Sequence, residues 1–234
     1  MISRPRVLVV QPEGVCPVGM VGLWLAEAGV DCDVLAAEKG RALPAVLGDA
    51  AGLIVMGGRM GADDDVDHRW MVPTKALIIG TVAARAPFLG ICLGHQLAAS
   101  ALGGEVRRNE HGPTVGLVPW SPSEEGRADE LTEALAPGTP MFHHNNDVVT
   151  RLPARAVALA HTPDGHVQAA RYGPRAWGVQ FHPEVTPDVA SGWGQGPEDT
   201  QSLQAATALR EREAELHRGW EPLARRFARI VRGG

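Results

Sequence analysis

Residues 87–96, PFLGICLGHQ, join a short apolar run to a segment of helical length through one cysteine flanked by glycines. The run 87–91 is typical of a buried strand, and residues 94–102 are typical of a helix that ends at the glycine pair after them. Glycines two positions before and after Cys92 leave space for a tight turn between the strand and the helix. The segment therefore predicts a strand, a sharp turn that carries a thiol, and a helix.

Similar apolar runs bounded by glycine or proline occur upstream. We expect strands at residues 6–10, 32–35 and 52–56, and helices at residues 18–28 and 73–84. This alternation is typical of parallel strands linked by crossover helices. The amino-terminal half therefore predicts an α/β fold with an open, mostly parallel, twisted sheet.

Beyond residue 105 the chain changes to shorter, β-branched segments separated by proline and glycine. Residues 156–160, 166–172 and 176–181 are expected to be strands, and Gly173-Pro174 indicates a hairpin between the last two. This region therefore predicts additional strands with short turns.

A long amphipathic helix is expected at residues 201–232, after a Gly- and Pro-containing loop over residues 187–200. We expect its apolar stripe to cover one face of the sheet, because amphipathic helices usually pack on their own core; docking to a partner is the alternative. We expect residues 1–234 to form a single domain with a catalytic core at about 6–186.

Composition excludes several classes of protein. The 234 residues are 44% hydrophobic and 21% charged with a net charge of −5, which is typical of a globular chain. The 22 basic residues are scattered, so no nucleic-acid partner is expected, and no apolar run reaches the roughly 18–20 residues that span a membrane. Three cysteines and no apolar signal segment favour free thiols and a cytoplasmic location.

Cys92 is the candidate nucleophile. Its predicted position on a strand-to-helix turn is that of a nucleophile elbow, with cysteine in place of serine. The amino terminus of the following helix favours the thiolate form. Cys16 and Cys32 have no activating neighbours in sequence, so we expect them to be inert apolar residues.

A candidate base and its orienting group lie in the tripeptide His182-Pro183-Glu184. Proline holds the preceding histidine extended, and residues i and i+2 of an extended chain point to the same side. Glu184 can therefore accept a hydrogen bond from His182. The glycine pair Gly57-Gly58 follows a predicted strand, and its N–H groups, with that of Leu93, could form an oxyanion hole.

The motifs GICLGHQ at residues 90–96 and VQFHPE at residues 179–184 resemble those of class I, triad-type glutamine amidotransferases, and residues 56–58 match the oxyanion strand of that family. The sequence is most similar to stand-alone members related to the amidotransferase domain of GMP synthetase. The resemblance implies a flavodoxin-like sheet with helices on both faces. It also implies a catalytic triad of Cys92, His182 and Glu184. The oxyanion hole that it implies is formed by Gly58 and Leu93, and the implied substrate-binding residues are Gly57 and Gln96.

The implied reaction is hydrolysis of L-glutamine to glutamate and ammonia through a γ-glutamyl thioester. The chain carries no ATP-pyrophosphatase loop and no phosphate-binding loop, so the resemblance implies a separate synthase that accepts the ammonia. Histidines and aspartates lack the spacing of metal sites, and we expect no metal and no cofactor.

Two alternatives remain open. A γ-glutamyl peptidase or hydrolase would use the same triad without a partner, and a non-catalytic regulatory subunit would use only the fold. Residues 143–147 read HHNND where GMP synthetases carry Ser-His-Gly-Asp, so the role of this segment and the acceptor of the ammonia are open as well.

Overall fold

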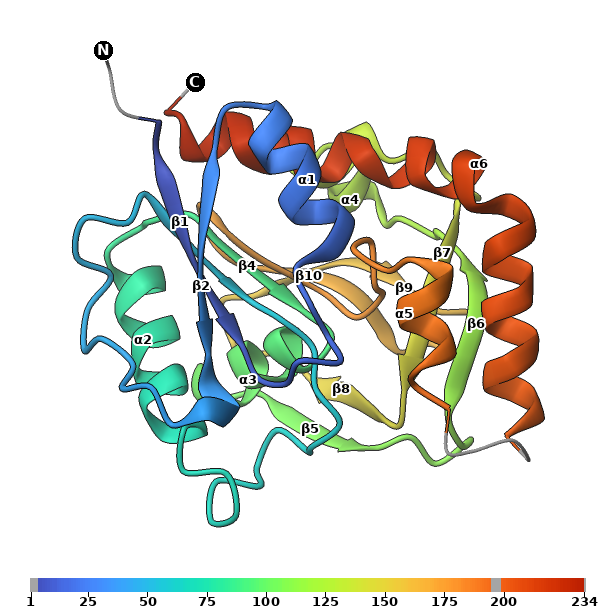
Figure 1. Ribbon diagram of the computed structural model, residues 1–234, viewed down its shortest axis with the longest axis horizontal. Helices are drawn as coiled ribbons and strands as arrows, with labels where there is room; N and C mark the ends of the chain where they lie inside the picture. Colours follow the sequence, from blue (N-terminus) through green and yellow to red (C-terminus); the bar gives the residue numbers. More distant parts are fainter. Residues whose placement is uncertain (1–3, 195–198, 234) are drawn as a thin grey trace.

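The computed structural model describes residues 4–194 and 199–233 of the chain. A seven-stranded sheet in the order β2-β1-β3-β4-β11-β10-β9 forms its centre (Figure 1). The strands of this sheet are β1 (Arg6–Gln11), β2 (Asp31–Ala36), β3 (Gly52–Val55), β4 (Phe88–Ile91), β9 (Val157–His161), β10 (Val167–Gly173) and β11 (Ala176–Val179). The strands from β2 to β11 pair in parallel, β10 pairs antiparallel with β11, and β9 pairs antiparallel with β10. The expected open, mostly parallel sheet is confirmed, as is the hairpin at Gly173.

Helices cover both faces of this sheet (Figure 1). They are α1 (Gly19–Glu27), α2 (Met71–Ala83), α3 (Leu93–Ala101), α4 (Glu124–Arg127), α5 (Pro187–Ser191) and α6 (Thr200–Val231), with 3₁₀ turns η1 (Ala37–Lys39) and η2 (Thr132–Ala134). Alternate residues of a strand point to opposite faces. Val7 and Val9 of β1 accordingly pack with α1 and α6, whereas Leu8 and Val10 pack with α2 and α3. The central sheet is therefore buried on both sides.

Two small antiparallel sheets stand beside the central one. One pairs β5 (Glu105–Arg108) with β8 (Asp147–Arg151), and the other pairs β6 (Thr114–Pro119) with β7 (Pro140–Asn145). The sequence pattern predicts extra strands in this region, but it does not reveal that some of them leave the central sheet. The partners in each pair come from separate stretches of the chain, and local periodicity carries no information about that pairing.

The long helix α6 covers the face on which α1 lies, and its stripe packs into the core with the sheet, as expected. Trp220, which is fully buried, donates a hydrogen bond from Nε1 to the carbonyl of Pro140 at 2.8 Å. The helix therefore also anchors strand β7, which leads to the cavity described below.

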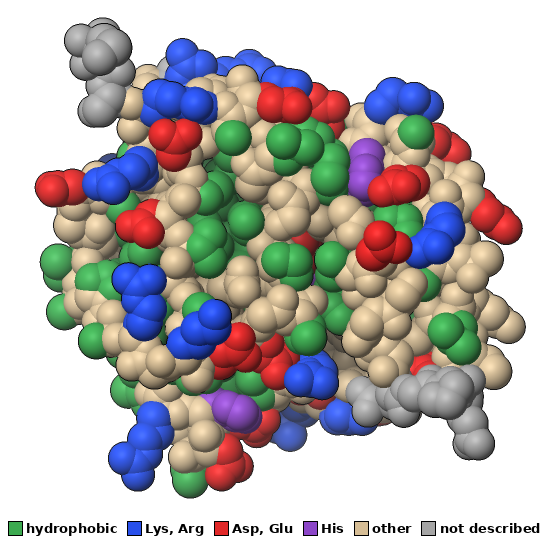
Figure 2. Space-filling view, in the orientation of Figure 1, with side chains coloured by type: hydrophobic (Ala, Val, Ile, Leu, Met, Phe, Trp, Pro, Cys, Tyr) green, Lys and Arg blue, Asp and Glu red, His purple; other side chains and the backbone are tan. Residues whose placement is uncertain are grey.

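The expected loop over residues 187–200 is wrong in its first part, where α5 forms. Pro187 is well placed at the first position of a helix, and the Thr186 side chain accepts a hydrogen bond from the Val189 N–H at 3.3 Å. Residues 195–198 of that range lie outside the described residues. Within the described ranges, no helix combines the length and apolar character that crossing a membrane requires. Charged side chains of both signs are interspersed on the face seen in Figure 2.

Candidate active site

Cys92 occupies the sharp turn between β4 and α3, as predicted. Its backbone is in the positive-φ region, with φ 49° and ψ −106°, a conformation that costs energy for a residue with a side chain. A Cβ atom on Gly90 would lie 2.5 Å from the carbonyl oxygen of Gly94, and one on Gly94 would lie 2.0 Å from the carbonyl oxygen of Val55. The two glycines are therefore required, because only they let the helix start pack against the neighbouring strand ends.

His182 and Glu184 lie together directly after β11. His182 Nδ1 is 2.8 Å from Glu184 Oε1, and both side chains are almost fully buried. A carboxylate only accepts, so Nδ1 donates the proton in this bond. His182 Nε2 is buried without a hydrogen-bond partner among the residues that the structure describes. A Cβ atom on Gly57 would lie 3.1 Å from His182 Cε1 and 3.6 Å from Cys92 Cβ, so the imidazole and the cysteine converge above this glycine.

The charges at this point favour an ion pair. Burial alone would lower the pKa of His182, but the charges of Glu184 and Cys92 outweigh burial and raise that pKa above its ordinary value near 6.5. An imidazolium next to a cysteine stabilises the thiolate. The arrangement can therefore hold a nucleophilic sulfur and an acidic proton side by side.

The amino-terminal end of α1 holds the backbone of Glu184. The N–H of Met20 donates to the carbonyl oxygen of Glu184 at 3.0 Å. Gly19 precedes it with φ 45°, and a Cβ atom there would lie 2.3 Å from the same oxygen. The backbone near residue 20 thus holds Glu184, which lies more than 160 residues later in the chain.

Gly57 and Gly58 follow β3, and the structure brings them to the cysteine, as predicted. Gly58 borders the cavity, whereas Gly57 packs under His182 and Cys92. A Cβ atom on Gly58 would lie 2.9 Å from Leu93 Cδ2. Leu93 is the first residue of α3, so its N–H has no acceptor within the helix. The two residues expected to form an oxyanion hole are therefore neighbours.

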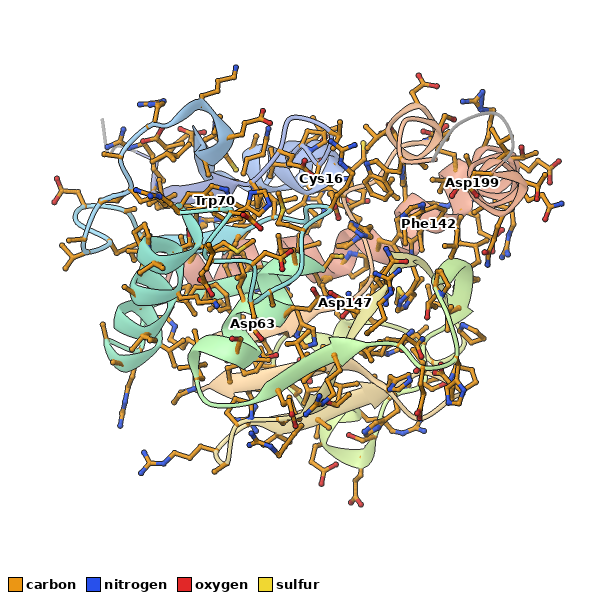
Figure 3. All side chains as sticks on the ribbon, turned by 90° about the horizontal axis from the view of Figure 1, so that it is seen from below. Cys16, Asp63, Trp70, Phe142, Asp147 and Asp199 are labelled. Atoms are coloured by element: carbon orange, nitrogen blue, oxygen red, sulfur yellow. The ribbon has the colours of Figure 1, made fainter. Side chains whose placement is uncertain are left out.

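A cavity of about 350 Å³ opens beside Cys92 and His182. Its other walls come from the segment after β3, from β5, from the adjoining ends of β7 and β8, and from the segment after α5. They include Arg59, Asp64, Arg108, Asn145, Asp147 and Trp193. Figure 3 shows Asp147 near the centre of the view, with Asp63 on one side and Phe142 on the other. Within the described ranges, no three acidic, histidine or cysteine side chains group as metal ligands would.

Gln96 of α3 lies on the cavity wall. Its Nε2 donates to the carbonyl oxygen of Asp147 at 2.9 Å and to Gln180 Oε1 at 3.2 Å. The side chain therefore links the predicted catalytic turn to the segment that follows β7.

The adjacent histidines of β7 point to opposite sides. His143 is fully buried, its Nδ1 lies 3.3 Å from Asn145 Oδ1, and burial lowers its pKa to about 4. His144 borders the cavity, and its Nε2 lies 3.0 Å from Ser202 Oγ. His144 is therefore the cavity histidine of this segment.

Cys16 and Cys32 differ in a way that the sequence does not reveal. Cys16 borders the cavity; burial, together with the charges of Cys92 and Glu184, raises its pKa strongly, so it stays a protonated thiol. Cys32 lies on β2, where burial raises its pKa to about 11. Both thiols are unactivated, but Cys16 belongs to the cavity wall.

Trp193 is a second cavity residue that no motif indicates. Its ring centroid lies 4.5 Å from that of His182, and its Nε1 donates to the carbonyl oxygen of Val15 at 2.7 Å. The indole therefore packs on the imidazole and is itself held by the segment that carries Cys16.

Residues 24–192 match the family model described as glutamine amidotransferase class-I. The glutamine-hydrolysing GMP synthase of Aeropyrum pernix is 32% identical over 186 residues, which are 79% of this chain and 34% of that relative. A glutamine-hydrolysing GMP synthase subunit from Ignicoccus hospitalis is 41% identical over 103 residues, 43% of this chain and 52% of the relative. The chain thus covers about a third to a half of the length of these curated relatives.

A solved structure of a glutamine amidotransferase from Thermotoga maritima superposes with a TM-score of 0.85 at 25% identity, over 97% of this chain and 98% of that one. Similarity in fold therefore extends to the long terminal helix as well as to the sheet. Because the family match extends over most of the chain and contains both motifs, the protein belongs to the class I glutamine amidotransferase family.

Proposed function

We propose that the protein hydrolyses the γ-carboxamide of L-glutamine to glutamate and ammonia, with Cys92, His182 and Glu184 as its catalytic groups. The observation that carries this proposal is the 2.8 Å contact between His182 and Glu184 next to a cysteine on a strained turn. Burying an ion pair of this kind costs free energy, because both charges lose their water. Such pairs cluster at functional sites, and this one lies at the wall of a cavity.

In the first half of the reaction, the Cys92 thiolate attacks the amide carbon. The N–H groups of Gly58 and Leu93 donate to the oxyanion that develops. His182 gives its Nε2 proton to the leaving nitrogen, ammonia departs, and the γ-glutamyl group remains on sulfur as a thioester. Glu184 stabilises the imidazolium and keeps its ring oriented.

In the second half, neutral His182 takes a proton from water, and the resulting hydroxide attacks the thioester carbon. The tetrahedral species collapses, the Cys92 thiolate leaves, and glutamate is released. The triad is thereby restored to its imidazolium–thiolate form.

We further propose that the ammonia is consumed by a separate synthase. One relative is named as a subunit of a glutamine-hydrolysing GMP synthase, and this supports the proposal that the present chain also works with a second protein. The cavity that contains Cys92 borders on exposed Arg59, so the site is open on one side to such a partner.

Release of glutamate and ammonia from L-glutamine by the purified protein, with and without candidate synthases, tests the proposal. C92A is expected to abolish release, whereas C32A, which changes a thiol on β2, should retain it. A glutamine-analogue diazoketone should label Cys92 in a peptide map. Cleavage of γ-glutamyl dipeptides far faster than glutamine, with no stimulation by any synthase, would contradict the amidotransferase and support a peptidase.

A further inference from the structure

Gln180 lies beside the cysteine that the proposed mechanism uses as nucleophile. Its side chain is buried, with 2% of its surface exposed, and its Nε2 is 3.5 Å from Cys92 Sγ. We propose that Gln180 is a positioning residue whose carboxamide donates a hydrogen bond to the Cys92 thiolate and stabilises that form. This inference rests on the proposed role of Cys92.

Strand pairing brings the two residues together. β11 pairs in parallel with β4, with Val179 opposite Ile91, and the N–H of Cys92 donates to the carbonyl oxygen of Val179 at 2.8 Å. The next residue, Gln180, is held on its other side, where its N–H donates to the carbonyl oxygen of Gln168 at 2.9 Å. The backbone of Gln180 is therefore fixed on both sides at the level of the sulfur.

Two polar groups of this segment lie beside the same sulfur. The Gln180 amide nitrogen is 3.5 Å from Cys92 Sγ, and His182 and Cys92 converge above Gly57, while Phe181 between them in sequence is buried in the core. The thiolate thus receives a charged neighbour from one residue and an amide from the other.

The neighbouring groups determine which end of the Gln180 amide faces the sulfur. The carbonyl oxygen of Asp147 can only accept, so the Gln96 atom that lies 2.9 Å from it is the nitrogen. That nitrogen also donates to Gln180 at 3.2 Å, and the Gln180 atom there must be the oxygen. Nε2 of Gln180 is therefore left to face Cys92 Sγ, where it can only donate.

A donor at this position has a direct chemical effect. Cys92 is 5% exposed, and burial disfavours a charged sulfur because it removes water from it. A hydrogen bond to an ionised group contributes more than one between neutral groups. Removing the Gln180 donor should therefore reduce the population of thiolate at neutral pH without touching the substrate.

The test measures the rate at which iodoacetamide alkylates Cys92, followed as its tryptic peptide by mass spectrometry across a pH series. Gln180→Met keeps the length of the side chain and removes the donor; we expect the alkylation midpoint to rise by about one to two pH units. Gln168→Met is the matched control, because Gln168 is equally buried but bonds to His143 rather than to Cys92. This control should keep the wild-type midpoint.

Gln180→Glu provides a second variant in case the methionine variant unfolds, which a thermal melt would show. A carboxylate cannot donate, so its midpoint should rise at least as far. Conservation of the wild-type midpoint in whichever of the two variants is folded would overturn the proposal, and so would an equal rise in Gln168→Met.

Alkylation does not depend on the substrate, so this result is separable from the proposed function. If the alkylation midpoint shifts but the wild-type protein does not hydrolyse glutamine, the role of Gln180 stands and the proposed reaction is wrong. If the wild-type protein hydrolyses glutamine but the midpoint does not shift, the proposed reaction stands and the role of Gln180 is wrong.

Discussion

The floor and the wall of the cavity are built in different ways. We use floor for the ends of β3, β4 and β11 with Cys92 and His182, and wall for the segment that carries Cys16, the 144–147 segment and Trp193. The floor is held by strand pairing and by close backbone approaches that only glycine allows. The wall is held by side-chain contacts between segments distant in sequence. The comparison indicates that the geometry of Cys92 and His182 is fixed by the backbone, whereas the geometry of the wall depends on individual side chains.

Gly94→Ala should have the largest effect, a loss of folding stability, because it disrupts the backbone packing of the floor. The new Cβ would lie 2.0 Å from the carbonyl oxygen of Val55, and this backbone atom cannot move without displacing β3. We expect a loss of about 3 kcal/mol or more in the free energy of unfolding, measured by urea denaturation. Gly80→Ala in α2 is the control, since nothing lies within 4 Å of its Cβ position, and it should be neutral or slightly stabilising.

Glu184→Gln should come next, because it leaves the frame in place and removes one charge. The amide cannot stabilise the imidazolium, and its NH₂ group can orient the ring with the wrong tautomer. We expect kcat for glutamine to fall roughly 10²- to 10⁴-fold, measured at a temperature where the thermal melt shows the variant to be folded. Glu27→Gln, which removes an exposed partner of Arg225, should keep the wild-type kcat. A kcat near wild type in Glu184→Gln would mean that this carboxylate has no part in catalysis.

The protonation of His182 distinguishes the floor from an ordinary buried histidine such as His143. Because the Glu184 and Cys92 charges raise the His182 pKa, the imidazolium should persist above pH 6.5 in ¹⁵N NMR spectra, whereas burial keeps His143 neutral down to about pH 4. The folded pKa of His182 exceeds the unfolded one, so its contribution to stability is complete below about pH 6.5 and is lost as pH rises through the folded value. In C92A the His182 pKa should fall. An unchanged His182 pKa in C92A would contradict an ion pair between the His182 imidazolium and the Cys92 thiolate.

Trp193→Ala tests the wall at its contact with the floor. Aromatic contacts of this kind contribute about 0.5–1.5 kcal/mol, so we expect kcat/KM to fall by up to about tenfold. Trp193→Phe keeps a ring against His182 and loses only the hydrogen bond to Val15. Its kcat/KM should therefore lie between those of the wild type and Trp193→Ala. Equal losses in both variants would assign the effect to the hydrogen bond rather than to the contact between the two rings.

Cys16→Ser should have the smallest effect, because this thiol stays protonated and belongs to the wall. Turnover and diazoketone labelling of Cys92 should remain close to wild type in steady-state assays. A loss comparable to that of C92A would mean that Cys16 takes part in the chemistry and that the division into floor and wall is wrong.

Sequence reasoning locates the floor because its determinants are local. The strand, the turn and the start of the helix around Cys92 lie within one decapeptide, and the His182–Glu184 pair lies within three residues. The wall depends on contacts between distant segments, such as Trp193 with Val15 or Gln96 with Asp147, and no spacing rule reveals them. The turn at Thr186 that starts α5 is recognisable only in retrospect, from a capping side chain followed by proline.

The contact between Met20 and Glu184 has a consequence for the order in which the site is completed during synthesis. Two neighbours of the turn at Cys92, β3 and α3, are made before the second half of the chain, whereas Val179, whose carbonyl oxygen accepts a hydrogen bond from the Cys92 N–H, is made later. His182 and Glu184 are made later still, and the backbone of Glu184 is then anchored on Met20 of α1, a helix made near the beginning. A nascent chain thus carries Cys92 well before it carries His182 and Glu184, so the proposed triad is completed late in synthesis.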